Sequence, residues 1–234
     1  MFMEWPDWVT AHALFPAFSQ EVHDGAVPVF SDAGPVWALL DPEATNGLKS
    51  QLMETLNAYS EPTQDPTKSG ATVDESQGPV VVHANAIVEP SVHFIGPCLV
   101  ESGASIRHGA YVRPYAWICS GSVVGHSTEI KHSVLLPGAK APHFNYVGDS
   151  ILGCGVNLGA GTKLSNLRND GGEVHLRFDG QRLGSGLRKF GAILGENCQL
   201  GCNSVTNPGT VLGPNSLVWP NITVTGLSPA HSTH

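Results

Sequence analysis

The stretch VHANAIVEPSVHFIGPCLVESGASIRHGAYVRPYAWICSGSVVGHSTEIKHSVLL, residues 82–136, has a large apolar residue at every sixth position. These positions are Val82, Val88, Phe94, Val100, Ile106, Val112, Ile118, Val124, Ile130 and Leu136. Four residues after almost every one of them, the sequence has a small or β-branched residue, as at Ala86 and Val134. A period of six matches neither the repeat of a helix nor simple strand alternation. The sequence therefore predicts a repeat architecture.

The same frame continues beyond this stretch at Tyr146, Leu152, Leu158, Leu164, Leu194, Leu200, Thr206, Leu212, Val218 and Val224. Each hexad predicts a short strand and a turn, with its large residue inside a triangular prism, and three hexads close one coil. The expected fold is an all-β, left-handed parallel β-helix of about six coils over residues 80–228. Two interruptions predict a loop at 137–145 and an arm at 167–192, which contains a hairpin around Asp179-Gly180.

The first part of the chain lacks the hexad period. Residues 1–58 carry three of the five tryptophans and two helix-like stretches, at 9–23 and 43–58. We expect a small helical cap that covers the open end of the first coil. The polar, turn-rich residues 59–79 predict a linker, and residues 229–234 a short tail.

Composition limits the classes of function. The chain has 234 residues, with 12 basic and 20 acidic side chains and a net charge of −8. This acidic balance argues against binding to nucleic acid or to a membrane surface. The N-terminus shows no signal-peptide pattern, and the five cysteines form no CxxC pair, which predicts reduced thiols and a cytoplasmic protein.

Three cationic or imidazole side chains are candidates for chemistry. Arg113 and Lys131 are separated by three hexads, one full coil, so they are expected to stack on successive coils. Such a cation pair, with no acid expected nearby, suits a phosphate group. His143 lies beside aromatic residues in the predicted loop, where it can act as a general base near neutral pH.

A longer motif points to a known family. KAPHFNYVGDSILGCGVNLGAGTKLSN, residues 140–166, resembles the acetyltransferase domain of the bacterial bifunctional N-acetylglucosamine-1-phosphate uridyltransferase/glucosamine-1-phosphate acetyltransferases. NLRNDGGEV (166–174) and GSGLRKFGAILG (184–195) resemble archaeal-type enzymes with the same two activities. The resemblance covers about residues 80–226. It implies N-acetylation of an amino-sugar phosphate such as glucosamine 1-phosphate by acetyl-CoA, in the synthesis of UDP-N-acetylglucosamine.

The resemblance also implies roles for individual residues. His143 falls on the catalytic histidine of that family, and no metal is required. The matched substrate-binding and cofactor-binding positions are Arg113, Lys131, Tyr146, Asn157 and Asn166 for the sugar phosphate, and Ala160 and Cys202 for acetyl-CoA. Cys202 replaces a serine of the bacterial enzyme. The Gly-rich nucleotide loop of the family has no counterpart here, so acyl transfer without nucleotidyl transfer is expected.

The family assembles as trimers, with acetyl-CoA between two prisms. Tyr111, Trp117 and Leu135 are expected at outward positions, where they favour a homotrimer. Arg188 and Lys189 of the arm would then bind the CoA phosphates of a neighbouring site.

Two other functions remain open at this point. One is a sugar-nucleotide or CoA-binding scaffold without turnover, which the N-terminal addition and Cys202 favour. The other is a carbonic-anhydrase-like metal enzyme, since His108 and His126 are also separated by three hexads. The sequence offers no third ligand in phase with them, so no metal site is predicted.

Overall fold

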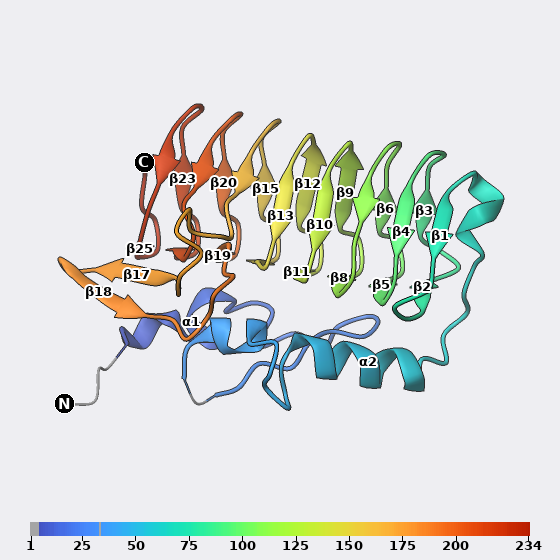
Figure 1. Cartoon of the computed structure of the whole chain (residues 1–234), viewed down its shortest axis with the longest axis horizontal. Coiled ribbons are helices and arrows are strands. Elements are labelled where there is room, and N and C mark those ends of the chain that lie inside the picture. Colours follow the sequence, from blue (N-terminus) through green and yellow to red (C-terminus); the bar gives the residue numbers. More distant parts are fainter. Residues whose placement is uncertain (1–4, 33) are drawn as a thin grey trace.

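A computed structural model describes residues 5–32 and 34–234 and shows a parallel β-helix (Figure 1). Its strands form three sheets that run along the sides of a prism, and each strand pairs with the strand one coil away. The predicted left-handed β-helix is confirmed. Residues 1–4 of the predicted cap lie outside the described residues.

The first sheet has the order β1 (Thr72–Asp74), β4 (His93–Ile95), β7 (Tyr111–Val112), β10 (Glu129–Lys131), β13 (Tyr146–Gly148), β16 (Lys163–Leu164), β21 (Val205–Thr206) and β24 (Thr223–Val224). The second, which we call the covered sheet, has β2 (Val80–Val82), β5 (Cys98–Val100), β8 (Ala116–Ile118), β11 (Ser133–Leu135), β14 (Ile151–Leu152), β19 (Ala192–Leu194), β22 (Thr210–Leu212) and β25 (Leu227–Ser228). The third sheet has β3 (Ile87–Val88), β6 (Ser105–Ile106), β9 (Val123–His126), β12 (Lys140–His143), β15 (Asn157–Leu158), β20 (Gln199–Leu200) and β23 (Leu217–Val218).

The solenoid is longer than predicted. Two sheets of the described chain have eight strands, so the prism has at least eight coils instead of about six. The additional coils come from both ends and from the predicted loop. Strand β1 lies in the stretch 59–79 that was expected to be a linker, after a 3-10 helix at Pro66–Ser69. In the predicted tail, Thr233 bridges to Leu217 and continues the stack.

The hexad frame shifts by one position in the middle of the prism. Leu135, not Leu136, pairs with Ile118 and belongs to the interior cluster. The next inward residues are Ala141 and Val147, so Tyr146 faces outward. The predicted extruded loop 137–145 is therefore wrong: its central residues form the regular strand β12, flanked by ordinary turns, in a coil slightly shorter than three full hexads. Both Leu135–Leu136 and Tyr146–Val147 are apolar pairs, so the pattern did not reveal the shift.

The N-terminal residues cover one face of the prism instead of its end. They contain a 3-10 helix at Asp7–Val9, α1 (Ala11–Leu14), a 3-10 helix at Val36–Leu40 and α2 (Leu48–Ala58). Figure 1 shows them running along the solenoid. Their apolar side chains pack on the outward residues of the covered sheet, namely Leu99, Trp117, Val134, Ile151, Ile193 and Val211. This sheet is buried on both faces, as its continuous apolar strands require.

Helix α1 is much shorter than the predicted stretch 9–23. Pro16 disfavours helical backbone at Phe15, whose φ and ψ are −131° and 61°. The region predicted at 43–58 is largely confirmed as α2.

Two glutamates at the edge of the covered sheet hold the N-terminal residues. Glu196 is buried and accepts hydrogen bonds from the backbone N–H groups of Ala17 (3.1 Å) and Phe18 (2.7 Å). Glu101 is fully buried and accepts from the N–H of Ala26 (2.9 Å) and the hydroxyl of Tyr59 (3.0 Å). Each carboxylate thus replaces the water that free backbone donors would otherwise bind.

The arm forms the predicted hairpin, with β17 (His175–Phe178) and β18 (Gln181–Gly184) around Asp179-Gly180. Its buried residues Val174, Leu176, Leu187 and Phe190 belong to the same cluster as the N-terminal residues. Within the described chain, we find no helix with the length and apolar character needed to cross a membrane.

Candidate functional site

A pocket of about 490 Å³ lies where the first sheet meets the covered sheet. We call it the cationic pocket, because its lining includes five basic side chains: Lys49, Arg113, Lys131, Arg188 and Lys189. The solenoid supplies Arg113 and Lys131, the arm supplies Arg188 and Lys189, and α2 supplies Lys49. The predicted stacking of Arg113 and Lys131 is seen directly, because Val112 pairs with Ile130 in adjacent strands.

The expectation that no acid accompanies this cation pair is wrong. Arg113 Nη1 lies 2.6 Å from Oε1 of Glu129, which precedes Lys131 in the same strand. Lys131 Nζ lies 2.7 Å from Oδ2 of Asp149. Arg113 and Lys131, the two pocket cations that the solenoid supplies, therefore each have a carboxylate partner. Arg188 and Lys189 form no ion pair with any described residue.

Asp149 is the centre of a buried polar network. Its Oδ2 accepts hydrogen bonds from Lys131 and from the amide of Asn166, and its Oδ1 lies 2.9 Å from Nδ1 of His132. Asp149 and His132 have φ values of 48° and 41°, in the sparsely populated left-handed region. The two strained corners thus place a carboxylate and an imidazole face to face beneath the pocket.

The network shifts the pKa of Asp149. Burial by itself would raise this pKa, but the hydrogen bond with His132, the charge of Lys131 and the bond from Asn166 outweigh it and lower the pKa to about 2. The carboxylate is thus ionised at neutral pH. Nε2 of His132 is buried and has no hydrogen-bond partner among the described residues.

Tyr146 and Asn166 adjoin the same network. Asn166 also hydrogen-bonds the phenol of Tyr146, whose pKa is raised by burial and then by the negative charge of Asp149. A Cβ atom at Gly148 would lie 2.6 Å from Tyr146 Oη, so only glycine leaves room for the tyrosine ring there. The structure therefore brings together Arg113, Lys131, Tyr146, Asn166, Arg188 and Lys189.

Of the other predicted site residues, His143, Ala160 and Cys202 lie at the opposite edge of the first sheet, where it meets the third sheet, and Asn157 begins strand β15 of the third sheet. His143 ends β12 and is exposed, and neither it nor Asn157, Ala160 or Cys202 lines the cationic pocket of its own chain. His143 and Ala160 occupy successive coils, since Gly161 donates its N–H to the His143 carbonyl. Asn203 likewise donates to the Ala160 carbonyl, which places Cys202 one coil further. These residues form one column, which we call the His143 column.

The His143 column exposes unused backbone donors. The N–H groups of Ala160 and Cys202 make no hydrogen bond with another described residue, as is also true of Ser120 and Cys154 at the equivalent turn position of other coils. Such donors can bind an anionic or developing oxyanion. Cys202 is also the only exposed thiol of the five cysteines; Cys98, Cys119 and Cys198 are buried.

The histidine pair considered for a metal stacks as the spacing predicts. The rings of His108 and His126 are 5.5 Å apart, and His126 makes an edge contact with Phe144. Over residues 5–32 and 34–234, no group of three or more His, Cys, Asp or Glu side chains is placed to hold a metal ion.

Sequence reasoning missed Glu129, Asp149, His132 and Lys49. Asp149 carried a signal, because it lies three hexads after Lys131 and within the quoted YVGD motif. Lys49 carried none, since its place depends on how the N-terminal residues dock. Its Nζ lies 5.3 Å from the ring centre of Tyr115, at the rim of the pocket.

Several known proteins are similar to this chain. A bifunctional sugar-1-phosphate nucleotidylyltransferase/acetyltransferase of Sulfurisphaera tokodaii is 36% identical over 155 residues, which are 58% of this chain and 39% of that protein. The chain thus spans well under half of that relative. An uncharacterized acetyltransferase, YaiX of Escherichia coli, is 28% identical over 190 residues, covering 81% of this chain and 83% of that one.

Among solved structures, PerB from Caulobacter crescentus in complex with CoA and GDP-perosamine is 18% identical, with a TM-score of 0.25 over 70% of this chain and 54% of that one. Residues 94–223 match the family described as the GMPPB C-terminal domain, which is more than half of the sequence. The chain belongs to the GMPPB C-terminal domain family.

Proposed function

We propose that this protein is an acetyltransferase that moves the acetyl group of acetyl-CoA to the amine of an amino-sugar phosphate, such as glucosamine 1-phosphate. The observation that carries the proposal is the placement of the cationic pocket and the His143 column on the two edges of one sheet face. The names of the sequence relatives, which include acetyltransferases, support it.

The cationic pocket is suited to the phosphate end of the acceptor. Asp149 and Glu129 neutralise Lys131 and Arg113 in part. Among the described residues this leaves Arg188, Lys189 and Lys49 as the pocket cations without an ion pair, free to bind phosphate oxygens. Charge-assisted hydrogen bonds from a guanidinium group to phosphate oxygens are stronger than hydrogen bonds between neutral groups. Tyr146, which adjoins the same network through Asn166, would then lie beside the sugar ring.

The His143 column is suited to acyl transfer. His143 would take a proton from the acceptor ammonium, so that the neutral amine can attack the thioester carbonyl. The N–H groups of Ala160 and Cys202 would stabilise the developing oxyanion. The C–N bond forms and the C–S bond breaks, the nitrogen loses its second proton to the leaving sulfur, and CoA leaves as the thiol while His143 returns the first proton to water. Such a direct transfer needs neither a metal nor a covalent enzyme intermediate. Much of the rate would come from holding the two substrates together.

A homotrimer would complete the site by adding a neighbouring chain. Of the residues predicted to favour it, Trp117 is buried under the N-terminal residues and Leu135 points inward, so neither is available. The third sheet offers other apolar groups, since Ile87, Leu217 and Trp219 are exposed there. We therefore propose a trimer in which the third sheet is covered.

The decisive experiment measures CoA thiol release from acetyl-CoA across a series of amino-sugar phosphates and nucleotide-linked amino sugars. The proposal expects release that depends on an acceptor amine and fails with the N-acetylated sugar. The alternative hypothesis is a binding or scaffolding protein without turnover. It predicts that calorimetry detects binding of CoA or of a sugar phosphate, while no acceptor yields product.

A further inference from the structure

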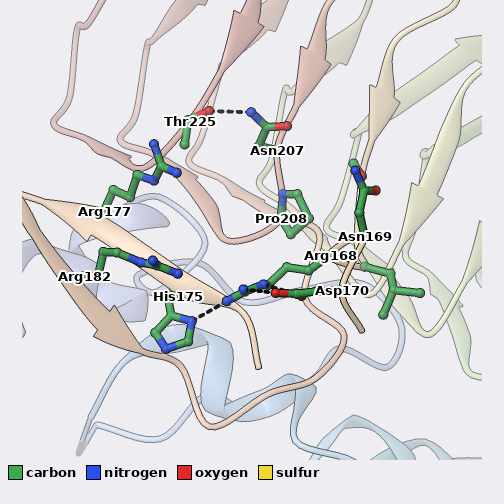
Figure 2. Close-up of a pocket in the computed structure, with 11 residues that line it drawn as sticks. Arg168, Asn169, Asp170, His175, Arg177, Arg182, Asn207, Pro208 and Thr225 are labelled. Atoms are coloured by element: carbon green, nitrogen blue, oxygen red, sulfur yellow. Dashed lines mark hydrogen bonds and ion pairs between the residues drawn. The ribbon is translucent and has the colours of Figure 1, made fainter. Parts of the chain in front are cut away.

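We propose that a second pocket, between the arm hairpin and the last coils, binds a phosphate or diphosphate group. The pocket has a volume of about 430 Å³ and shares no lining residue with the cationic pocket. Three arginines line it: Arg168, Arg177 and Arg182. Figure 2 shows the guanidinium groups of Arg177 and Arg182 directed into the space beside Pro208 and Arg168. This inference goes beyond acetyl transfer and does not depend on it.

Arg168 and the one acid of the pocket neutralise each other. Nε of Arg168 donates to Oδ1 of Asp170 at 2.9 Å, and its Nη2 pairs with Oδ2 of the same carboxylate. Its Nη1 also donates to the carbonyl of Glu173 at 2.8 Å and lies 2.7 Å from Nδ1 of His175. Arg168 is thus a fixed wall of the pocket, and Asp170 has little charge left for the other arginines.

Arg177 and Arg182 carry the unneutralised charge. They lie directly opposite each other in the hairpin ladder, and neither side chain forms a hydrogen bond or ion pair with another residue in the part of the chain described. Like charges directly opposite each other destabilise a two-stranded ribbon. In a chain with a net charge of −8, two adjacent free guanidinium groups are an unusual concentration of positive charge. A dianion between them would convert the repulsion into attraction.

The hairpin is held in place before any ligand binds. A Cβ at Gly226 would lie 2.6 Å from the Arg177 carbonyl, and one at Gly209 would lie 2.8 Å from Cγ1 of Val174. The two glycines of the last coils therefore let the hairpin backbone approach closely. Because the backbone of both arginines is already held in place, ligand binding costs less conformational entropy than it would on a mobile loop.

The lining also indicates which part of a ligand is recognised. His175 is the only residue with an aromatic ring among the described residues that line the pocket, and its ring already forms a hydrogen bond with Arg168. The pocket therefore has no unengaged aromatic ring on which a nucleobase could stack. Paired guanidinium groups match phosphate oxygens in geometry as well as charge. Nucleoside diphosphates and CoA both carry the required diphosphate.

The test is a calorimetric titration with inorganic pyrophosphate. We expect the Arg177→Gln/Arg182→Gln variant to lose one binding site per chain, or to bind at that site at least about tenfold more weakly. Arg177→Lys/Arg182→Lys keeps the charge and should bind with an intermediate affinity, because lysine cannot form the bidentate fork. Lys68→Gln/Arg107→Gln removes two positive charges near the first coils and should leave the affinity unchanged.

Circular dichroism and thermal unfolding show whether the glutamine variant is folded; removing the like-charge pair should leave it at least as stable as the wild type. Displacement of pyrophosphate from this site by UDP or by CoA identifies which compound supplies the diphosphate, and either result supports the proposal. Absence of pyrophosphate binding to the wild type, or equal binding to the glutamine variant, would overturn it.

Discussion

Asp149 makes the stability of the fold depend on pH. Its pKa falls from an ordinary value near 4 to about 2 in the folded chain. A lowered pKa stabilises the fold above the unfolded value, and this contribution is lost as the pH falls from about 4 towards 2. The size of the effect is about 2 kcal/mol.

The measurement is urea unfolding of the wild type and of Asp149→Asn at several pH values. The stability difference between the two should be largest above pH 4 and should shrink by about 2 kcal/mol as the pH approaches 2. A difference that stays constant over this window would mean that Asp149 titrates normally in the fold.

His143 is the residue on which the proposed chemistry depends. Replacing it with alanine should lower kcat by a factor on the order of 10² to 10⁴, because a positioned general base contributes about that much. His126, one coil away at the paired position, provides a matched control: His126→Ala should retain most of the activity. If a correctly folded His143→Ala chain turns over normally, another group removes the proton.

At the scale of the element, the docked N-terminal residues depend on Glu196. Glu196→Ala leaves the N–H groups of Ala17 and Phe18 without their acceptor. The expected loss is about 2–4 kcal/mol of unfolding free energy, since bonds to a charged acceptor contribute about 1.5–3 kcal/mol each. Urea unfolding measures it, and limited proteolysis should cut first within residues 5–32. Glu54→Ala, on the exposed face of α2, should change stability by less than about 0.5 kcal/mol. Equal effects of the two variants would contradict the anchoring role.

The strands and the N-terminal cover also show how much of the fold the sequence predicts. The hexads identified the inward residues correctly up to Ile130, because each of these positions carries a large apolar side chain that packs inside the prism. They did not reveal the shift at Leu135, where either of two adjacent leucines satisfies the pattern. The N-terminal cover was missed as well, although Leu99, Trp117 and Val134 had placed apolar groups on the outside of the same sheet. In the site, spacing placed Arg113 beside Lys131, but their carboxylate partners depend on side-chain conformations that spacing does not encode.

At the scale of the whole molecule, the proposed trimer predicts active sites shared between chains, in which the cationic pocket of one chain faces the His143 column of its neighbour. Light scattering should give about 74 kDa, since three chains of 24.7 kDa assemble. Mixing His143→Ala chains with Arg188→Gln/Lys189→Gln chains after partial denaturation should restore about a quarter of the wild-type rate, because one interface in four combines two intact halves. A fully active monomer, or mixtures that stay inactive, would contradict shared sites.

The N-terminal cover has a consequence for how the molecule unfolds. Coils of a solenoid contact only their neighbours, so such proteins can fray one repeat at a time from an end. Here a single segment packs on Leu99, Trp117, Val134, Ile151, Ile193 and Val211, which belong to six successive coils. Opening any of these coils disturbs a partner that all of them share. The cover therefore links distant repeats into one cooperative unit, and a prism built from repeats gains the all-or-none transition of a globular domain.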